Sequence, residues 1–210
     1  MNTATVVLLL VAAVAMSIDW WSVATDRLGV EFLAKPAVII ALIGVALAID
    51  TADNVERGVI IAALGASLVG DVVLMTPDAR FEAGLGAFLL AHVLYVVAFA
   101  PSLEVGPAVA AATLVVGLSL GVVPQMMERV RAGGRLLSFA VPVYIVAIGA
   151  TAVTAAGTGV IVTGLGGAAF FFSDALLGWN RFVGPAPGGR VLVHVTYHLG
   201  QVGLVLWLAA

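Results

Sequence analysis

The feature that most constrains this chain is a nearly unbroken series of apolar segments, each about long enough to cross a lipid bilayer. A spanning helix needs roughly 20 mostly apolar residues, and short turns with charged residues, glycine or proline separate the segments. Because the segments lack the alternation of apolar and polar residues found in membrane β-strands, they predict helices. We expect about eight, at 3–20, 36–50, 58–76, 83–100, 106–123, 138–156, 159–178 and 190–209.

Composition agrees with an all-α, polytopic membrane bundle. Apolar residues make up 62% of the 210 and charged residues only 10%, too few charges to cover a water-exposed surface. There is no cysteine, which excludes disulfides, Cys-ligated zinc and thiol nucleophiles. No basic stripe indicates nucleic-acid binding, and no obligatory protein partner is evident. We expect one transmembrane domain over 1–210. Its first segment is expected to be a spanning helix rather than a cleaved signal peptide, because no basic residue precedes it.

Positive charge is distributed unevenly between the predicted loops. The loops after segments 1, 3, 5 and 7 carry eight of the nine Lys and Arg residues, and the other side carries only Arg57. The positive-inside rule therefore places those four loops in the cytoplasm and both termini outside. We expect a multi-pass protein of a bacterial inner membrane. The eight residues are Arg27, Lys35, Arg80, Arg129, Arg131, Arg135, Arg181 and Arg190.

The segments also suggest an internal duplication. Asp71 in the third segment corresponds to Asp174 in the seventh, since each follows a small residue and precedes a Leu by three positions. Two four-helix halves, 1–104 and 105–210, would have the same orientation about an axis along the membrane normal, because four is even. The fourth and eighth segments agree through His92 and Tyr95 against His194 and Tyr197.

Polar residues inside the segments gather in one half of the membrane, as the 1.5 Å rise per helical residue shows. A charged side chain in a bilayer costs about 3 kcal/mol, so Asp71 and Asp174 are the leading functional candidates. Lys35 is predicted at the start of the second helix and Asn180 just beyond the end of the seventh. On the eighth helix one face carries His194, Tyr197, His198 and Gln201; His92 and Tyr144 complete the group.

Several of these residues have a structural interpretation as well. Buried Tyr and Gln side chains often form hydrogen bonds between helices, and Gly117-x-x-x-Gly121 is typical of close helix packing. A serine hydrolase is poorly supported, because Ser67 and Ser173 have no G-x-S-x-G motif and no obvious base nearby.

Two carboxylates at similar depth can serve as an acid/base pair, one protonated and the other ionised. A zinc site of His92, His194, His198 and an Asp is the alternative, since three protein ligands plus water make a catalytic zinc site. The spacing of these histidines matches no recognised zinc pattern. The carboxylate interpretation expects no metal and no other cofactor, and the role of His194 and His198 stays open.

The sequence resembles the YhhN/lysoplasmalogenase family of membrane proteins from the second helix to the eighth. Lys35-Pro36 fits the family pattern, whereas His198 departs from it, because a second aromatic residue is expected after the Tyr. The resemblance implies eight spanning helices and hydrolysis of the lysoplasmalogen vinyl ether bond to a fatty aldehyde and a glycerophospho-base, without a known cofactor. The motifs are Gly70-Asp71-x-x-Leu74-Met75, Gly84-x-x-x-Phe88-x-x-x-His92-x-x-Tyr95-x-x-x-Phe99, Gly167-Ala168 leading to Phe171-x-Ser173-Asp174 and Phe182, and Tyr197-x-x-x-Gln201.

In this resemblance Asp71 and Asp174 match the family's paired aspartates. One would protonate the vinyl ether, and the other would stabilise the oxocarbenium ion and direct water to it, as paired carboxylates do in glycosidases. Lys35 and nearby arginines would hold the phosphate of a lysophospholipid. The sequence does not show which Asp is the acid. The residues expected to bind or orient substrate are Lys35, His92, Tyr95, Tyr144, Ser173, Asn180, Tyr197 and Gln201.

Two other functions fit intramembrane Asp and His residues. A small proton-coupled transporter or lipid flippase is one, but the predicted outer half of the bundle has almost no polar lining. A metal-dependent lipid amidase or esterase is the other, and it differs from the leading hypothesis in needing a cation.

Overall fold

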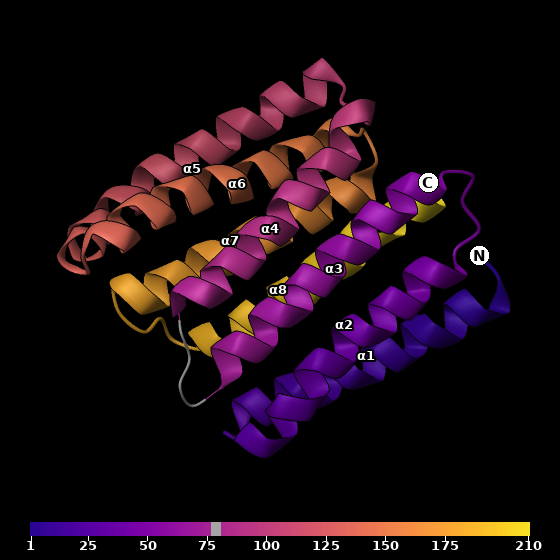
Figure 1. Ribbon diagram of the computed structural model, residues 1–210, viewed down its shortest axis with the longest axis horizontal. Coiled ribbons are helices and arrows are strands. Elements are labelled where there is room, and N and C mark those ends of the chain that lie inside the picture. The colour runs from indigo at the N-terminus through magenta and orange to yellow at the C-terminus, as the bar shows by residue number, and fades with distance from the viewer. Residues whose placement is uncertain (77–80) are drawn as a thin grey trace.

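The computed structural model describes residues 1–76 and 81–210, so Arg80 lies outside the described residues. The described residues form eight helices that are long and apolar enough to span a membrane, as predicted (Figure 1). Short 3-10 turns follow the fourth and eighth helices, at Ala100–Ser102 and Leu206–Ala209. The helices are α1 (Thr3–Ala24), α2 (Leu28–Ala48), α3 (Asn54–Met75), α4 (Phe81–Phe99), α5 (Val105–Ala132), α6 (Arg135–Gly157), α7 (Ile161–Phe182) and α8 (Gly189–Val205).

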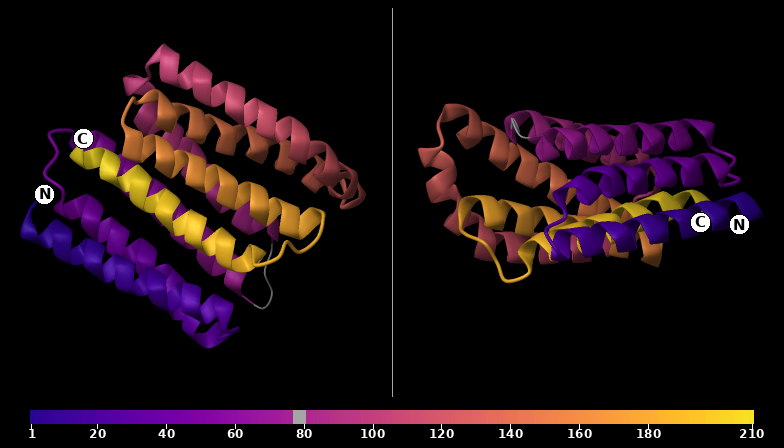
Figure 2. Two further views of the ribbon diagram at one scale, coloured as in Figure 1. Left: turned by 180° about the vertical axis from the view of Figure 1, so that it is seen from behind. Right: turned by 90° about the horizontal axis from the view of Figure 1, so that it is seen from below.

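The eight helices run side by side, with the α1–α2 pair at one edge of the bundle and α5 at the other (Figures 1 and 2). Between those edges, α3 and α4 pack together on one side, and α6, α7 and α8 lie behind them. The two ends of the chain lie near each other at the same end of the bundle (Figure 1). The inner helices therefore enclose the buried polar side chains, and α5 is mostly exposed.

Local sequence signals explain several helix ends. The side chain of Asn2 accepts a hydrogen bond from the Thr5 amide and caps α1, and Asp53 caps α3 in the same way. Gly134 and Gly188 precede α6 and α8 with φ of 103° and 63°, a backbone conformation that favours glycine. These residues allow the chain to reverse direction at the end where the polar groups gather.

Helices α7 and α8 pack closely through glycines. A Cβ atom on Gly166 would lie 2.8 Å from the backbone of Gly203, so a larger residue would push the helices apart. Gly117 and Gly121 make no such close contact within the chain, because a Cβ atom on either would meet nothing within 4 Å. The two glycines lie on α5, which has little of its surface buried.

The two largest differences from the predicted helix boundaries lie beside prolines. Helix α2 begins at Leu28, eight residues before 36, and contains Pro36. Helix α5 continues from 123 to Ala132 and contains Pro124. Neighbouring helices in a membrane bundle can satisfy the backbone groups that an internal proline frees. Lys35 consequently lies about 10 Å inside α2 rather than at its start.

Candidate active site

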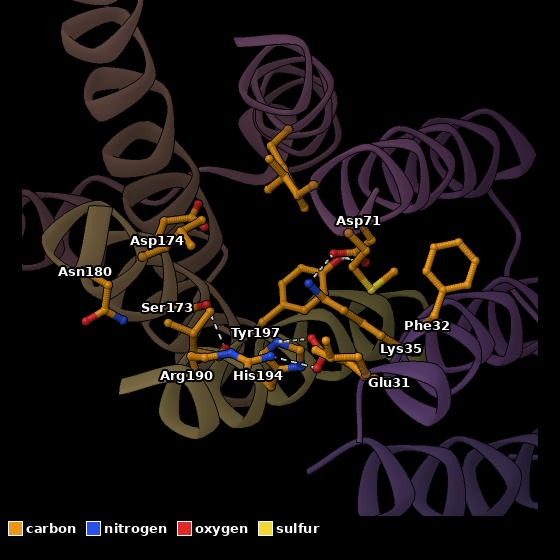
Figure 3. Close-up of a pocket in the computed structure, with 16 residues that line it drawn as sticks. Glu31, Phe32, Lys35, Asp71, Ser173, Asp174, Asn180, Arg190, His194 and Tyr197 are labelled. Atoms are coloured by element: carbon orange, nitrogen blue, oxygen red, sulfur yellow. Dashed lines mark hydrogen bonds and ion pairs between the residues drawn. The ribbon is translucent and has the colours of Figure 1, made fainter. Parts of the chain in front are cut away.

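A cavity of about 390 Å³ lies at the end of the bundle where α2 begins and α7 ends (Figure 3). It is bounded mainly by α2, α3, α7 and α8, and Asp71 and Asp174 line it from different helices. Its apolar wall includes Phe32, Leu74 and Phe88. The polar residues that line it are Glu31, Lys35, Asp71, Ser173, Asp174, Asn180, Arg190, His194 and Tyr197.

Asp71 lies in a buried ion pair. Its carboxylate is fully buried, with Oδ1 2.9 Å from Lys35 Nζ. The Tyr197 hydroxyl donates a hydrogen bond of 2.7 Å to Oδ2. The Lys35 ammonium also lies 5.4 Å from the centre of the Tyr197 ring, within range of a cation–π interaction. The ammonium of Lys35 favours the charged form of this carboxyl group, whereas its complete burial opposes that form.

Asp174 has a different set of partners. The Tyr144 hydroxyl donates to Oδ2 over 2.9 Å, and His92 Nε2 lies 2.8 Å from the same oxygen. The other ring nitrogen of His92 is 3.0 Å from Thr151 Oγ1. Among the described residues, no Lys or Arg forms an ion pair with Asp174, and no partner contacts Oδ1. The His92–Asp174 pair can therefore hold a proton beside the cavity.

A third polar group lies deeper in the bundle and does not line the cavity. The Tyr95 hydroxyl donates to Gln201 Oε1, and Gln201 Nε2 donates to Ser67 Oγ over 3.0 Å. These side chains are fully buried. The Phe170 ring contacts His92 and Tyr197, with ring centres 4.6 and 5.4 Å away. Tyr95 and Gln201 were predicted to bind or orient substrate. In the structure their hydrogen bond links α4 to α8 behind the site.

Ser173 and Asn180 reach the cavity while fixing the turn between α7 and α8. The Ser173 hydroxyl donates to the Val193 carbonyl over 2.9 Å, and the Asn180 side-chain oxygen accepts from the Ala186 amide over 2.9 Å. Asn180 lies inside α7, which continues to Phe182, and not beyond its end as predicted.

Sequence reasoning missed two acidic residues near the cavity. Asp19 is fully buried in α1, with Oδ2 2.7 Å from His194 Nδ1. Glu31 lines the cavity and pairs with Arg190 over 2.8 Å, and its other oxygen is 3.7 Å from His194 Nε2. The sequence signal for Asp19 was a charged residue in an apolar segment. Because that segment was predicted to end at residue 20, Asp19 was placed at the end of the helix, whereas α1 continues to Ala24.

The three histidines of the zinc interpretation have mostly different partners, although His198 Nδ1 also lies 3.8 Å from Asp19 Oδ2. His92 contacts Asp174 and Thr151, and His194 contacts Asp19. The Trp20 indole N–H donates to His198 Nδ1 over 3.1 Å. Across residues 1–76 and 81–210, no three His, Asp or Glu side chains are grouped so as to hold a metal ion. The described residues therefore do not bring together the ligands of the alternative zinc interpretation.

The chain matches the model of the YhhN family over residues 30–208. It belongs to that family. It is 34% identical over 152 residues to "Lysoplasmalogenase TMEM86B" of Rattus norvegicus, covering 69% of this chain and 58% of the relative. It is 35% identical over 160 residues to "Lysoplasmalogenase" of Mycobacterium tuberculosis, covering 72% and 59%. No solved structure matches the chain.

The YhhN match includes Lys35, Asp71, Asp174 and Tyr197, but Asp19 lies outside it. This YhhN chain spans less than two thirds of the length of the curated relatives above. Family membership agrees with the resemblance noted from the motifs. It places both carboxyl centres of the cavity within the region that defines the family.

Proposed function

We propose that this YhhN protein is a membrane-embedded hydrolase that cleaves the vinyl ether bond of lysoplasmalogen-type lysophospholipids. The observation that carries the proposal is that two buried aspartates with differently charged partners line one cavity. The names of the relatives supply the substrate class. The products would be a fatty aldehyde and a glycerophospho-base.

In this proposal Asp174 is the acid and Asp71 remains ionised. The ammonium of Lys35 stabilises the charge on Asp71. Asp174 has the neutral Tyr144 hydroxyl and an imidazole as its partners, so it can carry a proton and regain it through His92. The different partners thus divide the roles between two chemically identical side chains.

The reaction starts when Asp174 transfers a proton to the β-carbon of the vinyl ether. The C=C electron pair forms the new C–H bond, and positive charge develops on the α-carbon and the ether oxygen. The Asp71 carboxylate stabilises this oxocarbenium ion and orients a water molecule toward the α-carbon. Water adds and returns a proton to Asp174, giving a hemiacetal. The hemiacetal then breaks its bond to the glycerol oxygen, which takes the hydroxyl proton, and releases the aldehyde.

The polar mouth of the cavity suits the head group of a lysophospholipid. The Arg190 side chain is half exposed at that mouth, and Lys35 lies further in. A phosphate can pair with Arg190 while its glycerol reaches His194 and Asn180. We further propose that this end of the bundle faces the cytoplasm, because the loops at this end carry most of the chain's positive charge.

The test is hydrolysis by the purified protein of lysoplasmalogen and of an ester lysophospholipid, side by side. We expect aldehyde from the first and no fatty acid from the second. Glu128→Gln, which neutralises an exposed carboxylate on α5, is the matched control for Asp174→Asn and should keep full activity. Fatty acid release would instead indicate an esterase. Transport of the intact lipid into vesicles without aldehyde formation would support the transporter or flippase hypothesis.

A further inference from the structure

A second cavity, of about 220 Å³, lies among α4, α5, α6 and α7, and is almost wholly apolar. Leu85 of α4, Val122 of α5, Ile145 of α6 and Phe171 of α7 are among the side chains that form its walls. We call it the apolar cleft. A cavity with such walls suits a hydrocarbon rather than a polar ligand.

The apolar cleft and the polar cavity meet at Asp174 and Leu177, which line both. Asp174 therefore lies where the polar cavity and the apolar cleft meet. Tyr144, which donates to Asp174, also lines the cleft. An amphiphile with its head in the polar cavity would have its chain directed into the cleft.

The cleft opens toward the lipid-facing surface of the bundle. Leu118 and Phe172, two of its lining residues, are 60% and 51% exposed. Along α7 its lining extends from Phe171 to Phe182, a rise of about 16 Å. From Asp174 this lining extends about 12 Å to Phe182 in one direction and about 4 Å to Phe171 in the other. The open side lets a lipid enter from the membrane.

We propose that the apolar cleft binds the hydrocarbon chain of the lysolipid, so that the bond between head and chain lies at Asp174. The identity of the lysolipid rests on the proposed function, whereas the cleft and its continuity with the polar cavity do not. In a vinyl ether the β-carbon belongs to the chain side and the ether oxygen to the head side. This orientation brings the β-carbon to Asp174, the residue that we assign as acid.

A fluorescence measurement tests occupancy of the cleft. Trp179 lines it, so a non-hydrolysable alkyl-ether lysolipid with a brominated chain should quench that indole. We expect saturable quenching that an unbrominated lysolipid competes away and that Trp179→Phe removes. Quenching that rises without saturation, or that persists in Trp179→Phe, would show only ordinary bilayer lipid around the bundle and would overturn the proposal.

Kinetics with substrates of different chain length provide the second test. Ile145→Phe narrows the cleft, and the matched control Val146→Phe adds the same ring at the next position, which is 71% exposed. We expect Ile145→Phe to lower the ratio of kcat/KM for octadecenyl over decenyl substrate about tenfold or more, since pocket fit discriminates among hydrocarbons. Val146→Phe should leave the ratio unchanged. Should Ile145→Phe fold poorly, Leu118→Trp at the open edge serves instead.

The outcomes separate the two proposals. Saturable quenching without any aldehyde release would overturn the proposed function and leave the cleft as a lipid-chain site. Aldehyde release with an unchanged chain-length ratio in both cleft variants would support the hydrolase and overturn the cleft proposal. Quenching together with a changed ratio supports both.

Discussion

Asp71 on α3 and Asp174 on α7 line the same cavity, but the groups around them differ in charge. Asp71 is paired with the Lys35 ammonium, whereas Asp174 contacts His92 and the Tyr144 hydroxyl. In the proposed mechanism the first centre holds a carboxylate and the second a proton. Partners from neighbouring helices, rather than the residue type, therefore distinguish the surroundings of the two aspartates.

The two centres are built in a similar way. Each Asp is contacted from the helix before its own, by Lys35 of α2 or Tyr144 of α6. The second contact comes from the last helix of the other half, Tyr197 of α8 for Asp71 and His92 of α4 for Asp174. This exchange agrees with two related four-helix halves, although the duplication itself stays a prediction. The centres differ in both contacts, because a Lys and a Tyr surround Asp71 whereas a Tyr and a His surround Asp174.

Asp-to-Asn substitution should give the largest effect. We expect Asp71→Asn and Asp174→Asn each to lower turnover about 10³-fold, because a carboxamide neither donates a carboxylic proton nor carries the balancing charge. The double variant should be hardly worse than either single one, since the members of one catalytic unit are strongly non-additive. Aldehyde release in detergent preparations of matched thermal stability measures this. Near-normal turnover in well-folded Asp174→Asn would end the paired-carboxylate hypothesis.

Lys35→Met should affect the Asp71 centre through both stability and activity. Loss of the ammonium leaves the fully buried Asp71 carboxylate without its counter-charge, a change that costs about 3 kcal/mol or more. Asp71 is then expected to bind a proton and lose its role. Thermal unfolding should show that Lys35→Met with Asp71→Asn is more stable than Lys35→Met alone. A less stable double variant would contradict the buried ion pair.

His92→Gln and Tyr144→Phe should have smaller effects at the Asp174 centre. Each removes one hydrogen bond to a reacting carboxyl group, worth about 1.5 kcal/mol or roughly tenfold in rate. Turnover should fall by that amount while KM stays within twofold. Tyr197→Phe at the Asp71 centre is the matched comparison, because the ion pair between Lys35 and Asp71 remains after that substitution. We expect Tyr197→Phe to retain more activity than Tyr144→Phe, and the opposite order would contradict the division of roles.

Tyr95→Phe should change stability slightly and catalysis hardly at all. Tyr95 donates to Gln201 behind both centres, and interhelical hydrogen bonds of this kind contribute about 0.6 kcal/mol on average. A small fall in the unfolding temperature with unchanged kcat/KM is the expected result. A large loss of kcat at normal stability would show that this deeper group takes part in the chemistry.

Chelation should have no effect if both centres work as carboxyl groups. Purified protein treated with a strong chelator should keep its aldehyde release, and elemental analysis should find no stoichiometric zinc. Loss of activity on chelation, with recovery when zinc is added, would indicate instead that the histidines bind a catalytic zinc ion. His92→Gln would then be expected to abolish turnover rather than reduce it.

Sequence alone determined the spanning helices and singled out the two aspartates that line the cavity. The helices follow from apolar length, a local property that needs no tertiary contact. Asp71 and Asp174 follow from the cost of a charge in a bilayer, which holds whatever the neighbouring helices are. The eight helices agree with this, although α2 begins eight residues earlier and α5 ends nine residues later than predicted.

Only the tertiary structure decided which side chains surround each Asp. The His92–Asp174 contact joins residues 82 positions apart, and Asp19 meets His194 across 175 positions. Periodicity gives the face of a helix on which a residue lies, but not which helix packs against that face. The close approach of α7 and α8 depends on glycines whose fit is visible only in three dimensions. Partner identity, and with it the charge of each carboxyl group, is a property of packing between helices rather than of spacing along the chain.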